Sequence, residues 1–458
     1  MALKPADSAA TPQWSSRFAF LMAAIGSSVG LGNLWRFPFQ TGQNGGSAFV
    51  LVYLLCVVFV AYPILIGELA VGRHKGLSAV GSTAGLARDS GKSPAWGVTG
   101  LVGAFASFLI LTTYSVIAGQ VMAYSLMSFL GEFAGRNASD AAAVAPLYNS
   151  VIHALGWHTL FMAITVLVVS RGLHGGIEKV VTVLMPLFFL MLALLCGYAL
   201  MGGGAREAID YLFAPRFSEI TPSTVLAALG QAFFSIGVGA GLMITYGSFL
   251  GRRDNIADSG AIIAGSDTLV AVVAGLMIFP IVFTHGLDPA AGAGLIFGAL
   301  PAVFANMPAG SIIGGLFFFL AFIAALTSSI SLLLVVSVVG QEQMKLPAKV
   351  SAVAFGILAW AIGAWTVVSP DVGPWVDFIS GSIALPLGGL LVAVFAGWIV
   401  PRAIMRDELP NAGEGVFRYW RLMIRYAAPL AVFVILLLGL DAKFDFGLND
   451  FITSLQGG

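Results

Sequence analysis

Two apolar stretches far apart in the chain are each interrupted near their middle by a cluster of glycines. The first contains Gly30-Leu31-Gly32-Asn33 and the second contains Gly237-Val238-Gly239-Ala240-Gly241. Glycine costs a helix about 1 kcal/mol relative to alanine, so each cluster marks a point where a helix ends at low cost. Non-helical backbone is tolerated inside a membrane only where it is buried in protein or lines a cavity. A matched pair of such breaks indicates a substrate and ion site between two discontinuous membrane helices.

The composition of the chain requires a membrane. Of its 458 residues, 58% are hydrophobic and only 10% are charged, whereas about 25% of residues are charged in soluble domains. The net charge is zero and no basic run occurs, which argues against a nucleic-acid partner. Cys56 and Cys196 both lie in apolar runs and are expected to be packed free thiols. The polar residues 1–14 lack the pattern of a signal peptide, so we expect an uncleaved, cytoplasmic N-terminus.

The apolar segments predict an all-α integral membrane protein. A membrane-spanning helix needs about 20 apolar residues. Counting on that basis predicts about eleven transmembrane helices, at 16–38, 45–71, 96–130, 157–172, 178–201, 222–249, 258–284, 310–340, 350–369, 376–400 and 419–440. The stretch from Gly286 to Gly310 is also apolar, but Pro289, Pro301 and Pro308 interrupt it. We expect a re-entrant or capping loop there rather than a twelfth helix.

The basic residues are distributed unevenly between the two sides of these helices. With a cytoplasmic N-terminus, most of the 22 Lys and Arg residues fall on the cytoplasmic side, and only Arg136, Arg206, Arg216 and Lys443 fall outside. Cytoplasmic loops of membrane proteins are enriched in Lys and Arg. The chain is therefore predicted to be a multi-pass protein of the cell's inner (plasma) membrane, with membrane lipid as a partner.

Four charged residues fall at the depth of the bilayer: Arg36, Glu68, Asp267 and Asp377. Such charges are costly and indicate function by default, although Arg36 and Glu68 also fit a snorkelling or helix-capping role. Arg36 lies one turn outside the first glycine break, and Asp377 is its expected partner. Asp267 has no Lys or Arg within ten residues on its own segment. Its carboxylate must therefore meet a cation or take a proton.

Oxygen donors for a cation are available near the same depth. Ser28, Asn33 and Ser235 lie at the two breaks, and Thr327-Ser328-Ser329 lie on a later helix. Carboxylates, hydroxyls and carbonyls suit a hard cation, for which Na⁺ is the first candidate. Ser and Thr also occur in membrane helices as interhelical packing residues, so the Thr-Ser-Ser run alone leaves both interpretations open.

Longer motifs resemble the neurotransmitter:sodium symporter family. They are Trp14-Ser15-Ser16-Arg17, the segment from Gly30 to Pro38, Asn44-Gly45-Gly46, the segment from Glu68 to Arg73, the segment from Gln231 to Ser235, and Leu326-Thr327-Ser328-Ser329. The resemblance covers nearly the whole chain and implies one transporter domain over 1–458. It implies a 5+5 inverted repeat, at about 16–201 and 222–400, with unwound helices 1 and 6 and an extra helix at about 419–440. Many relatives carry a twelfth helix that this chain lacks.

The resemblance also implies two sodium sites and no organic cofactor. One sodium ion would meet the Ser28 carbonyl, Asn33, Ser235, Asp267 and the carboxylate of the substrate. The second would meet the carbonyls of Gly26, Val29 and Ala324 and the hydroxyls of Thr327 and Ser328.

An amino acid is the substrate that the resemblance implies. Its carboxylate would meet the N–H groups of Leu31 and Gly32 and the hydroxyl of Tyr114, because a half-helix N-terminus attracts anions. Its amine would meet the carbonyls of Ser28, Phe234 and Ser235. Tyr114 and Phe234 would form an outer lid, with an Arg36–Asp377 pair above it. The other expected pocket residues are Ile110, Gly237, Gly239, Ala240, Ser328, Ser331 and Leu332.

Two departures from the family bear on the substrate. Gly30 stands where amine-transporting relatives carry an aspartate, so a substrate with its own carboxylate is the better fit. Gly237 and Ala240 replace larger groups of the leucine-type member. This loss of side-chain volume favours a bulky hydrophobic or aromatic amino acid, unless neighbouring side chains repack.

Other departures bear on ions and on the inner gate. Asp267 replaces a neutral amide beside the chloride site of chloride-dependent relatives, so chloride should be dispensable. The basic residue often found shortly before Trp14 is absent, which puts the usual inner latch to Glu342 in doubt. Gly176 and Pro186 match a family pattern that permits the fifth helix to unwind, although Pro186 fits an ordinary kink equally well.

The sequence thus predicts a secondary active, sodium-coupled amino-acid symporter that works by alternating access. A proton-coupled or exchange transporter of the same fold, with Asp267 as the proton carrier, is the alternative. A membrane receptor or channel, in which the glycines would serve gating, is more remote. An enzyme is not expected, because no nucleophile, base and orienting group occur together. No residue pattern specifies an oligomeric state.

Overall fold

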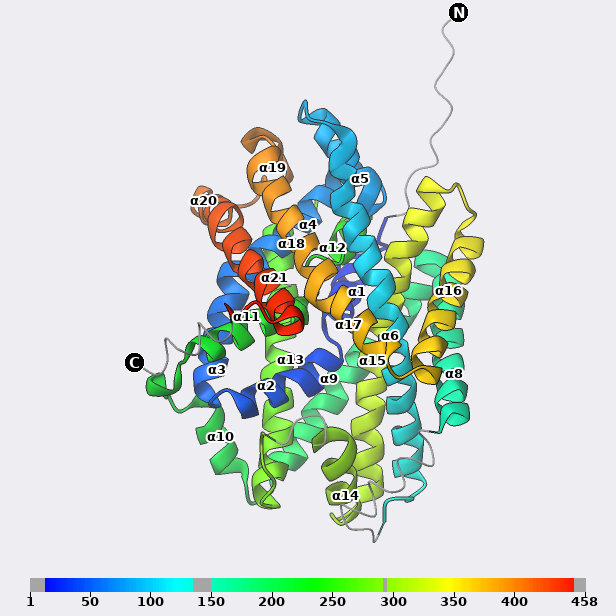
Figure 1. Cartoon of the computed structure of the whole chain (residues 1–458), viewed down its shortest axis with the longest axis vertical. Helices are drawn as coiled ribbons and strands as arrows, with labels where there is room; N and C mark the ends of the chain where they lie inside the picture. Colours follow the sequence, from blue (N-terminus) through cyan, green and yellow to red (C-terminus); the bar gives the residue numbers. More distant parts are fainter. Residues whose placement is uncertain (1–12, 135–149, 291–294, 449–458) are drawn as a thin grey trace, which may run out of the picture.

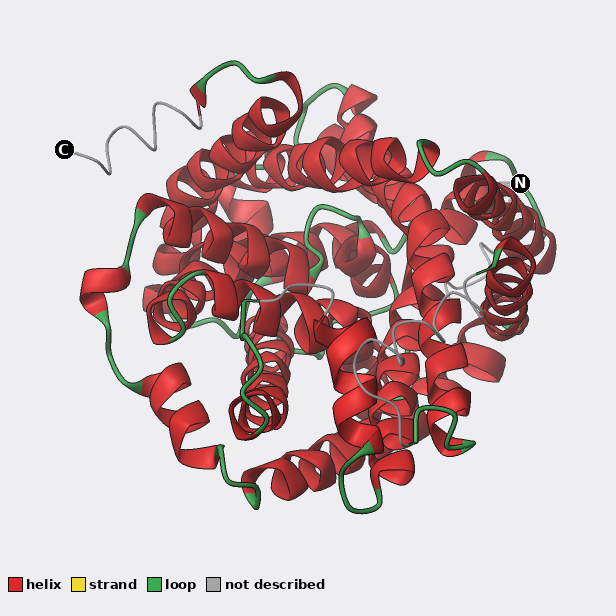
Figure 2. Cartoon of the chain, turned by 60° about the horizontal axis from the view of Figure 1, so that its bottom comes forward, coloured by secondary structure: helices red, strands yellow, loops and turns green. Residues whose placement is uncertain are grey.

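The computed structural model describes residues 13–134, 150–290 and 295–448. The expected N-terminal stretch lies almost entirely outside the described residues, and so does Arg136. Every regular element in the described part of the chain is a helix (Figure 2).

The first half of the chain begins with a broken helix and contains four of the nine long apolar spans found among the described residues. Its elements are α1 (Arg17–Ser28), the π-helical turn η1 (Gly32–Arg36), α2 (Phe37–Gln43), α3 (Ser47–Cys56), η2 (Val57–Ala61), α4 (Tyr62–Lys75), α5 (Ala79–Asp89), η3 (Pro94–Trp96), α6 (Gly97–Phe129), α8 (Val151–Ser170), η4 (Leu173–Ile177), α9 (Glu178–Leu200), α10 (Ala205–Phe213) and η5 (Phe217–Glu219).

The second half begins with another broken helix. Its elements are α11 (Pro222–Ile236), α12 (Leu242–Ser248), α13 (Ile256–Thr284), η6 (Leu295–Ala299), α14 (Leu300–Ala305), α15 (Gly310–Gln343), α16 (Ala348–Val368), α17 (Val372–Asp377), η7 (Phe378–Ala384), α18 (Leu385–Val394), η8 (Phe395–Ile399), α19 (Arg402–Glu408), α20 (Glu414–Leu422), η9 (Met423–Ala427) and α21 (Ala428–Phe444).

All eleven segments predicted to span a membrane are helical. Within the described residues, nine helical stretches are long and apolar enough to cross a bilayer, and the bent pair of α1 with η1–α2 makes a tenth. The remaining predicted span, at 222–249, is divided into the short helices α11 and α12. Between α13 and α15 the described residues form only η6 and α14, in agreement with a capping segment in place of a further span.

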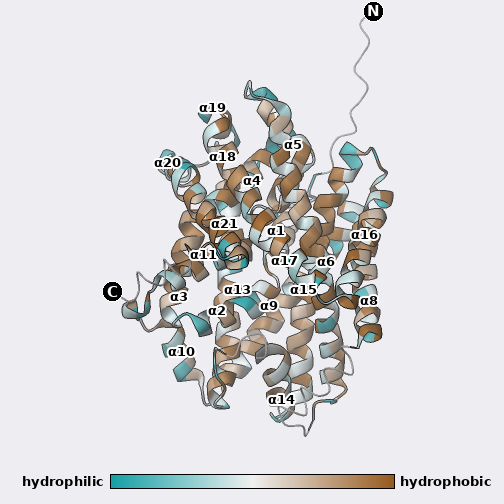
Figure 3. Cartoon of the chain, in the orientation of Figure 1, coloured by the Kyte–Doolittle hydropathy of each residue, from teal (hydrophilic) through white to brown (hydrophobic). Residues whose placement is uncertain are grey.

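The core of the molecule lies along α15. The apolar part of α15 is 89% buried, whereas that of the stretch Glu414–Phe444 is only 17% buried. α15 packs along α6, while α8 and α16 lie together at one side of this pair (Figure 1). Hydrophilic residues lie at the end of the bundle that carries α5, α19 and α20, and others lie beside α10 (Figure 3). The low burial of the last stretch places α21 at the periphery of the bundle.

The first break lies immediately beside α15. α1 ends at Ser28, Val29 is extended with φ −70° and ψ 112°, and the two halves are bent by 50°. A Cβ atom added to Gly30 would lie 2.9 Å from the Ser328 Oγ atom, which is closer than real Cβ contacts. The nearest atoms are the hydroxyl oxygens of Ser328 and Tyr114, so a larger residue at position 30 would require these two side chains to move.

The second break has a different cause. Gly237, Gly239 and Gly241 have φ angles of +71°, +92° and +69° between α11 and α12. This left-handed region is favourable for glycine and costly for other residues. The alternating glycines therefore end α11 and turn the chain before α12, so both predicted breaks are confirmed.

Candidate functional site

The two breaks bring two of the predicted ion ligands, Asn33 and Ser235, against Asp267. Asp267 lies on α13 and is completely buried. Asn33 Nδ2 donates to Asp267 Oδ1 at 2.7 Å, and Ser235 Oγ donates to Asp267 Oδ2 at 2.7 Å. No basic side chain in the described part of the chain forms an ion pair with this carboxylate. The negative charge of a buried carboxylate is not balanced when all of its partners are neutral. A site with one such charge and several oxygen ligands fits a monovalent cation.

Ser28 links the first break to the second. Its hydroxyl donates to the Ile236 carbonyl at 3.2 Å and to the Ala24 carbonyl at 3.3 Å. Asn33 holds the first break from the other side, because its Oδ1 atom accepts from the Gly30 N–H at 2.9 Å. The residues expected to bind one sodium ion thus also hold the two unwound segments against each other.

A second cluster of oxygen atoms surrounds Ser328 on α15. Ser328 Oγ lies 3.5 Å from the Gly26 carbonyl oxygen, 3.3 Å from that of Val29 and 3.1 Å from that of Ala324. Thr327 Oγ1 lies 3.1 Å from the same Ala324 oxygen. All five groups expected around a second sodium ion are therefore adjacent, and their neutral oxygens fit a hard monovalent cation.

A cavity of about 70 Å³ lies between the two breaks. Tyr114 reaches its wall from α6, and its hydroxyl accepts a 3.4 Å hydrogen bond from the Leu31 N–H. Eleven of the expected substrate residues line the cavity: Ser28, Leu31, Gly32, Ile110, Tyr114, Phe234, Ser235, Gly237, Ala240, Ser328 and Leu332. Gly30 of the first break also lines it, together with three residues that the sequence did not indicate, namely Ser27, Leu242 and Leu385.

Two expected pocket residues do not line this cavity. Gly239 faces away, since its N–H donates to Glu68 Oε1 at 2.7 Å and an added Cβ would collide with the Leu385 carbonyl. Ser331 bonds to the Tyr246 hydroxyl at 2.6 Å and donates to the Thr327 carbonyl at 2.8 Å. Both residues therefore support the wall of the cavity from behind.

Glu68 has a role that the sequence left undecided. Its side chain is fully buried, and its two oxygens accept from the N–H groups of Gly239 at 2.7 Å and Met243 at 3.2 Å. Gly239 lies between α11 and α12, and Met243 lies in the first turn of α12, so neither N–H group has a partner within a helix. Glu68 thus caps the second break. The sequence signal for a role of Glu68 was its charge at bilayer depth.

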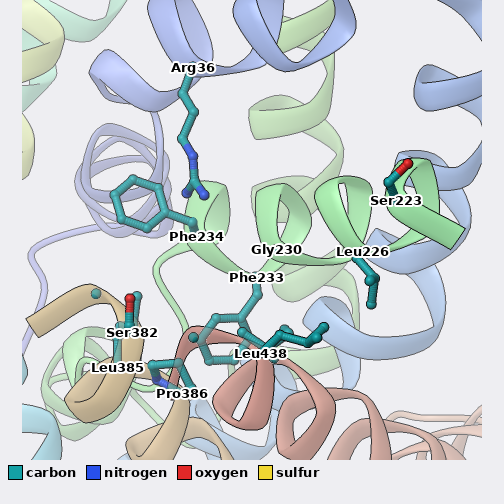
Figure 4. Close-up of a pocket in the computed structure, with 13 residues that line it drawn as sticks. Arg36, Ser223, Leu226, Gly230, Phe233, Phe234, Ser382, Leu385, Pro386 and Leu438 are labelled. Carbon is teal, nitrogen blue, oxygen red and sulfur yellow. The ribbon is translucent and has the colours of Figure 1, made fainter. Parts of the chain in front are cut away.

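The outer side of the cavity is closed by Phe234 and Leu385. Both residues also line a larger outer cavity of about 520 Å³, so they separate the two spaces. Figure 4 shows Arg36 pointing toward the Phe234 ring, and the guanidinium carbon lies 4.4 Å from the ring centroid. The expected Arg36–Asp377 ion pair is not formed in this structure. Arg36 is held by the ring, while Asp377 accepts a hydrogen bond from Thr113.

The inner side of the site is covered by the residues before α1. The indole N–H of Trp14 donates to the Tyr246 carbonyl at 3.1 Å, and its ring packs edge-on to Tyr246 with centroids 5.3 Å apart. The Ser15 N–H donates to Glu178 Oε1 at 2.9 Å, at the first residue of α9. The N-terminal segment is therefore attached to both α12 and α9.

Glu342 takes no part in this attachment. Its Oε2 atom accepts a 2.6 Å hydrogen bond from the Ser78 N–H, at the beginning of α5. This contact is in line with the absence of the usual basic residue before Trp14, which put a latch to Glu342 in doubt. Sequence reasoning did not identify Glu178, although it lies two residues after Gly176 and begins the helix that contains Pro186.

A charge cluster fixes the chain that leads away from the second break. Glu408 is fully buried, and its carboxylate lies 3.0 Å from each of Arg73 Nε, Arg252 and His74 Nδ1. Burial alone would raise the pKa of Glu408, but the hydrogen bonds from His74 and Arg73 and the charges of Arg252 and Arg73 hold it below its ordinary value. The cluster joins α4, the segment after α12 and α19.

Comparison with known proteins gives matches that cover most of the chain. The sequence profile described as the sodium:neurotransmitter symporter family matches residues 11–144 and 151–452. An uncharacterized sodium-dependent transporter of Bacillus subtilis (strain 168) is 37% identical over 93% of this chain and 97% of its own length. The sodium-dependent nutrient amino acid transporter 1 of Drosophila virilis is 26% identical over 92% of this chain and 76% of its own length.

A solved structure is also similar. The crystal structure of MhsT in complex with L-phenylalanine has a TM-score of 0.85 to this chain at 37% sequence identity. The match covers 93% of this chain and 99% of that one.

Proposed function

Since the chain belongs to the sodium:neurotransmitter symporter family, we propose that it is a sodium-coupled symporter of hydrophobic or aromatic L-amino acids. The observation that carries this proposal is the buried Asp267 carboxylate, which Asn33 and Ser235 hold between two helix breaks without any basic partner. Sodium supplies the missing charge, and a half-helix N-terminus next to it suits the carboxylate of an amino acid.

The proposed ion sites are two. The first uses the Ser28 carbonyl together with Asn33, Ser235 and Asp267, and the substrate carboxylate completes it. The second uses the oxygens gathered around Ser328. Because the substrate carboxylate contacts the first ion directly, each stabilises the binding of the other, which is the coupling that symport requires.

The proposed substrate is oriented by backbone groups and selected by volume. Its carboxylate meets the N–H groups of Leu31 and Gly32 and the Tyr114 hydroxyl, and its amine meets carbonyls at the breaks. Its side chain lies against Ile110, Ala240 and other apolar walls of the cavity. The complex of MhsT with L-phenylalanine supports a large apolar side chain by similarity.

Chloride independence follows from the same carboxylate. The Asp267 side chain supplies a fixed negative charge beside the first ion site, so no bound anion is needed to balance sodium. The proposed topology places the N-terminus in the cytoplasm of the cell, because most basic residues then lie inside.

Alternating access requires that the site open to one side at a time. Phe234, with Arg36 over its ring, is the proposed outer closure, and a pairing of Arg36 with Asp377 is proposed for a state in which the outer cavity has closed. The segment of Trp14 and Ser15 is the proposed inner closure.

Uptake into proteoliposomes tests the proposal. Radiolabelled amino acids are offered with an inward Na⁺ gradient, with choline in place of Na⁺, and in competition with all twenty amino acids. We expect saturable accumulation that needs Na⁺ and that phenylalanine, tryptophan, leucine or isoleucine inhibits. Accumulation driven by a proton gradient without Na⁺ would instead support the proton-coupled alternative, and Na⁺-dependent binding without accumulation would support a receptor.

A further inference from the structure

Two arginines one helical turn apart, at one end of the bundle, have no acidic partner among the described residues. Arg421 ends the α20 region and Arg425 lies in η9, one helical turn further along the same helix. They are close enough to interact electrostatically, and Arg402 adds to the same field. Among the described residues, no carboxylate forms an ion pair with Arg421 or Arg425. Two like charges without an acidic partner repel each other, and an anion from outside the chain would relieve this repulsion.

Neighbouring arginines show that the lack of a partner is particular to this pair. Arg402 lies 2.7 Å and Arg406 lies 3.7 Å from the carboxylate of Glu414. Arg421 instead donates to the Ala396 carbonyl at 3.2 Å, and the buried Nε atom of Arg425 has no hydrogen-bond partner in the described part of the chain. The bond to Ala396 uses one of the five N–H donors of Arg421, so each guanidinium group keeps terminal N–H donors for a further partner.

Aromatic residues fix Arg425 at the level expected for a membrane surface. Its guanidinium carbon lies 4.3 Å from the Trp398 ring centroid and 5.8 Å from that of Tyr426. The Trp398 indole N–H donates to the Arg425 carbonyl at 2.8 Å. Trp398 is 48% exposed and Tyr426 is 53% exposed. Exposed Trp and Tyr side chains of membrane proteins are enriched at the headgroup level of the bilayer.

A continuous apolar surface leads from this pair into the membrane. It consists of Leu430, Phe433 and Leu437 on α21, which are 67%, 45% and 38% exposed. Together with Tyr426 they recur every three or four residues and so lie on one face of the helix. We call these four residues the lipid-facing stripe.

We propose that Arg421 and Arg425 bind the phosphate of an anionic phospholipid, whose acyl chains lie along the lipid-facing stripe. Guanidinium groups bind phosphate oxygens bidentately, and basic sites between membrane helices on the cytoplasmic side bind anionic headgroups. A soluble phosphate would use only the arginines, whereas the lipid also uses the stripe. The lipid lies in the cytoplasmic leaflet, a position that rests on the proposed topology. The lipid thereby bridges η8, which contains Trp398, and η9, which contains Arg425.

Native mass spectrometry of the purified full chain tests this site. Phosphatidylglycerol, phosphatidylcholine with the same acyl chains, and glycerol phosphate are titrated separately, and the bound fraction is read as mass adducts. We expect phosphatidylglycerol to bind most tightly. The double variant Arg421→Gln with Arg425→Gln should weaken its binding roughly 30-fold, toward the affinity of phosphatidylcholine.

A matched control removes two charges elsewhere on the same side. Arg88→Gln with Lys92→Gln changes two exposed basic residues at and after the end of α5, and it should leave phosphatidylglycerol binding unchanged. Equal losses in both double variants would show general surface attraction and overturn the proposal. So would equal binding of glycerol phosphate, or unchanged binding in the Arg421 and Arg425 double variant. If that variant does not fold, Arg421→Lys with Arg425→Lys keeps the charges and should still weaken binding, because lysine lacks the planar fork.

Discussion

Asp267 combines three properties in one side chain. It is fully buried, it lies between the two breaks, and both of its oxygens already accept hydrogen bonds from neutral groups. Replacing it by asparagine keeps the shape and removes the charge, so the variant separates the electrostatic role of Asp267 from its packing.

We expect Asp267→Asn to make transport respond to chloride. With the fixed charge gone, sodium in the first site needs a mobile anion, and Tyr53 and Gln231 are the groups left to hold it. Gln231 Oε1 is buried without a hydrogen-bond partner in the described part of the chain, and Gln231 Nε2 already donates to the Gly32 carbonyl. Initial uptake rates at fixed Na⁺, with chloride exchanged for gluconate, measure the effect. A strict chloride requirement of the unsubstituted chain would contradict the charge-substitution argument.

Ala240 controls the volume available to the substrate side chain. It is almost completely buried and lines the cavity, and its carbonyl accepts a 2.6 Å hydrogen bond from Ser107 that fixes its position. Ala240→Phe should therefore shift competition from aromatic amino acids toward alanine and glycine. Competition assays with the full set of amino acids measure this shift. Undiminished inhibition by tryptophan in the variant would show that Ala240 is not part of the substrate wall.

At the level of elements, the hydropathy pattern predicts the fold well. All eleven predicted spans are helices, and both glycine clusters lie at breaks, because burial in lipid dominates these segments. The pattern did not indicate the short helices α5, α10 and α19. They lie outside the apolar segments, where packing against the bundle rather than hydropathy decides their conformation.

The sequence indicated which residues lie near the candidate site better than it indicated the contacts that they make. Its oxygen donors are together as expected, but Gly239 and Ser331 lie behind the wall and Arg36 lies on Phe234. The direction of a side chain depends on neighbours that are distant in sequence. The bond from Ser15 to Glu178 spans 163 residues, so no local pattern reveals it.

The attachment of the N-terminal segment to α9 makes a testable prediction. Glu178→Gln keeps an acceptor oxygen but loses the charge, which weakens the hydrogen bond from Ser15 and favours opening of the inner closure. A cysteine at the buried position Ala19, in a Cys56→Ser and Cys196→Ser background, reports that opening. We expect Glu178→Gln to increase its labelling by an impermeant thiol reagent from the cytoplasmic side by about fivefold.

Glu342→Gln serves as the matched control for this measurement. It removes the same charge from the residue that the family pattern would assign to the latch, but Glu342 contacts α5 in this chain. Its labelling rate should equal that of the parent. If Glu342→Gln accelerates labelling and Glu178→Gln does not, the inner closure is held through α5 instead of α9.

At the scale of the whole molecule, the two ion clusters connect different pairs of elements. The Asp267 cluster joins the breaks after α1 and α11 to α13, whereas the Ser328 cluster joins the first break to α15 at the core of the bundle. Sodium at the second cluster would therefore hold the broken helix against the most buried helix. Loss of this sodium ion would release the broken helix from α15. It would also remove half of the free energy that sodium entry supplies for uptake.

The number of coupled ions sets how far the substrate can be concentrated. One Na⁺ ion entering down about 100 mV releases about 2.3 kcal/mol, and a tenfold concentration gradient adds about 1.4 kcal/mol. Two ions thus support a concentration ratio of roughly 10⁵ for a zwitterion, whereas one ion supports only a few hundred. The double variant Thr327→Ala with Ser328→Ala should therefore lower the substrate ratio at which net flux reverses by at least about 100-fold.

The flux-reversal ratio is measured in proteoliposomes with a clamped potential and a fixed Na⁺ gradient. Ser329→Ala is the matched control, because Ser329 is equally buried but its hydroxyl has no hydrogen-bond partner in the described part of the chain. It should reverse at the same ratio as the parent. A reduced rate with an unchanged reversal ratio in the Thr327 and Ser328 double variant would mean that these hydroxyls affect turnover without binding a coupled ion. Because at a fixed potential and Na⁺ gradient the reversal ratio depends only on stoichiometry, this outcome would assign sodium coupling to other groups.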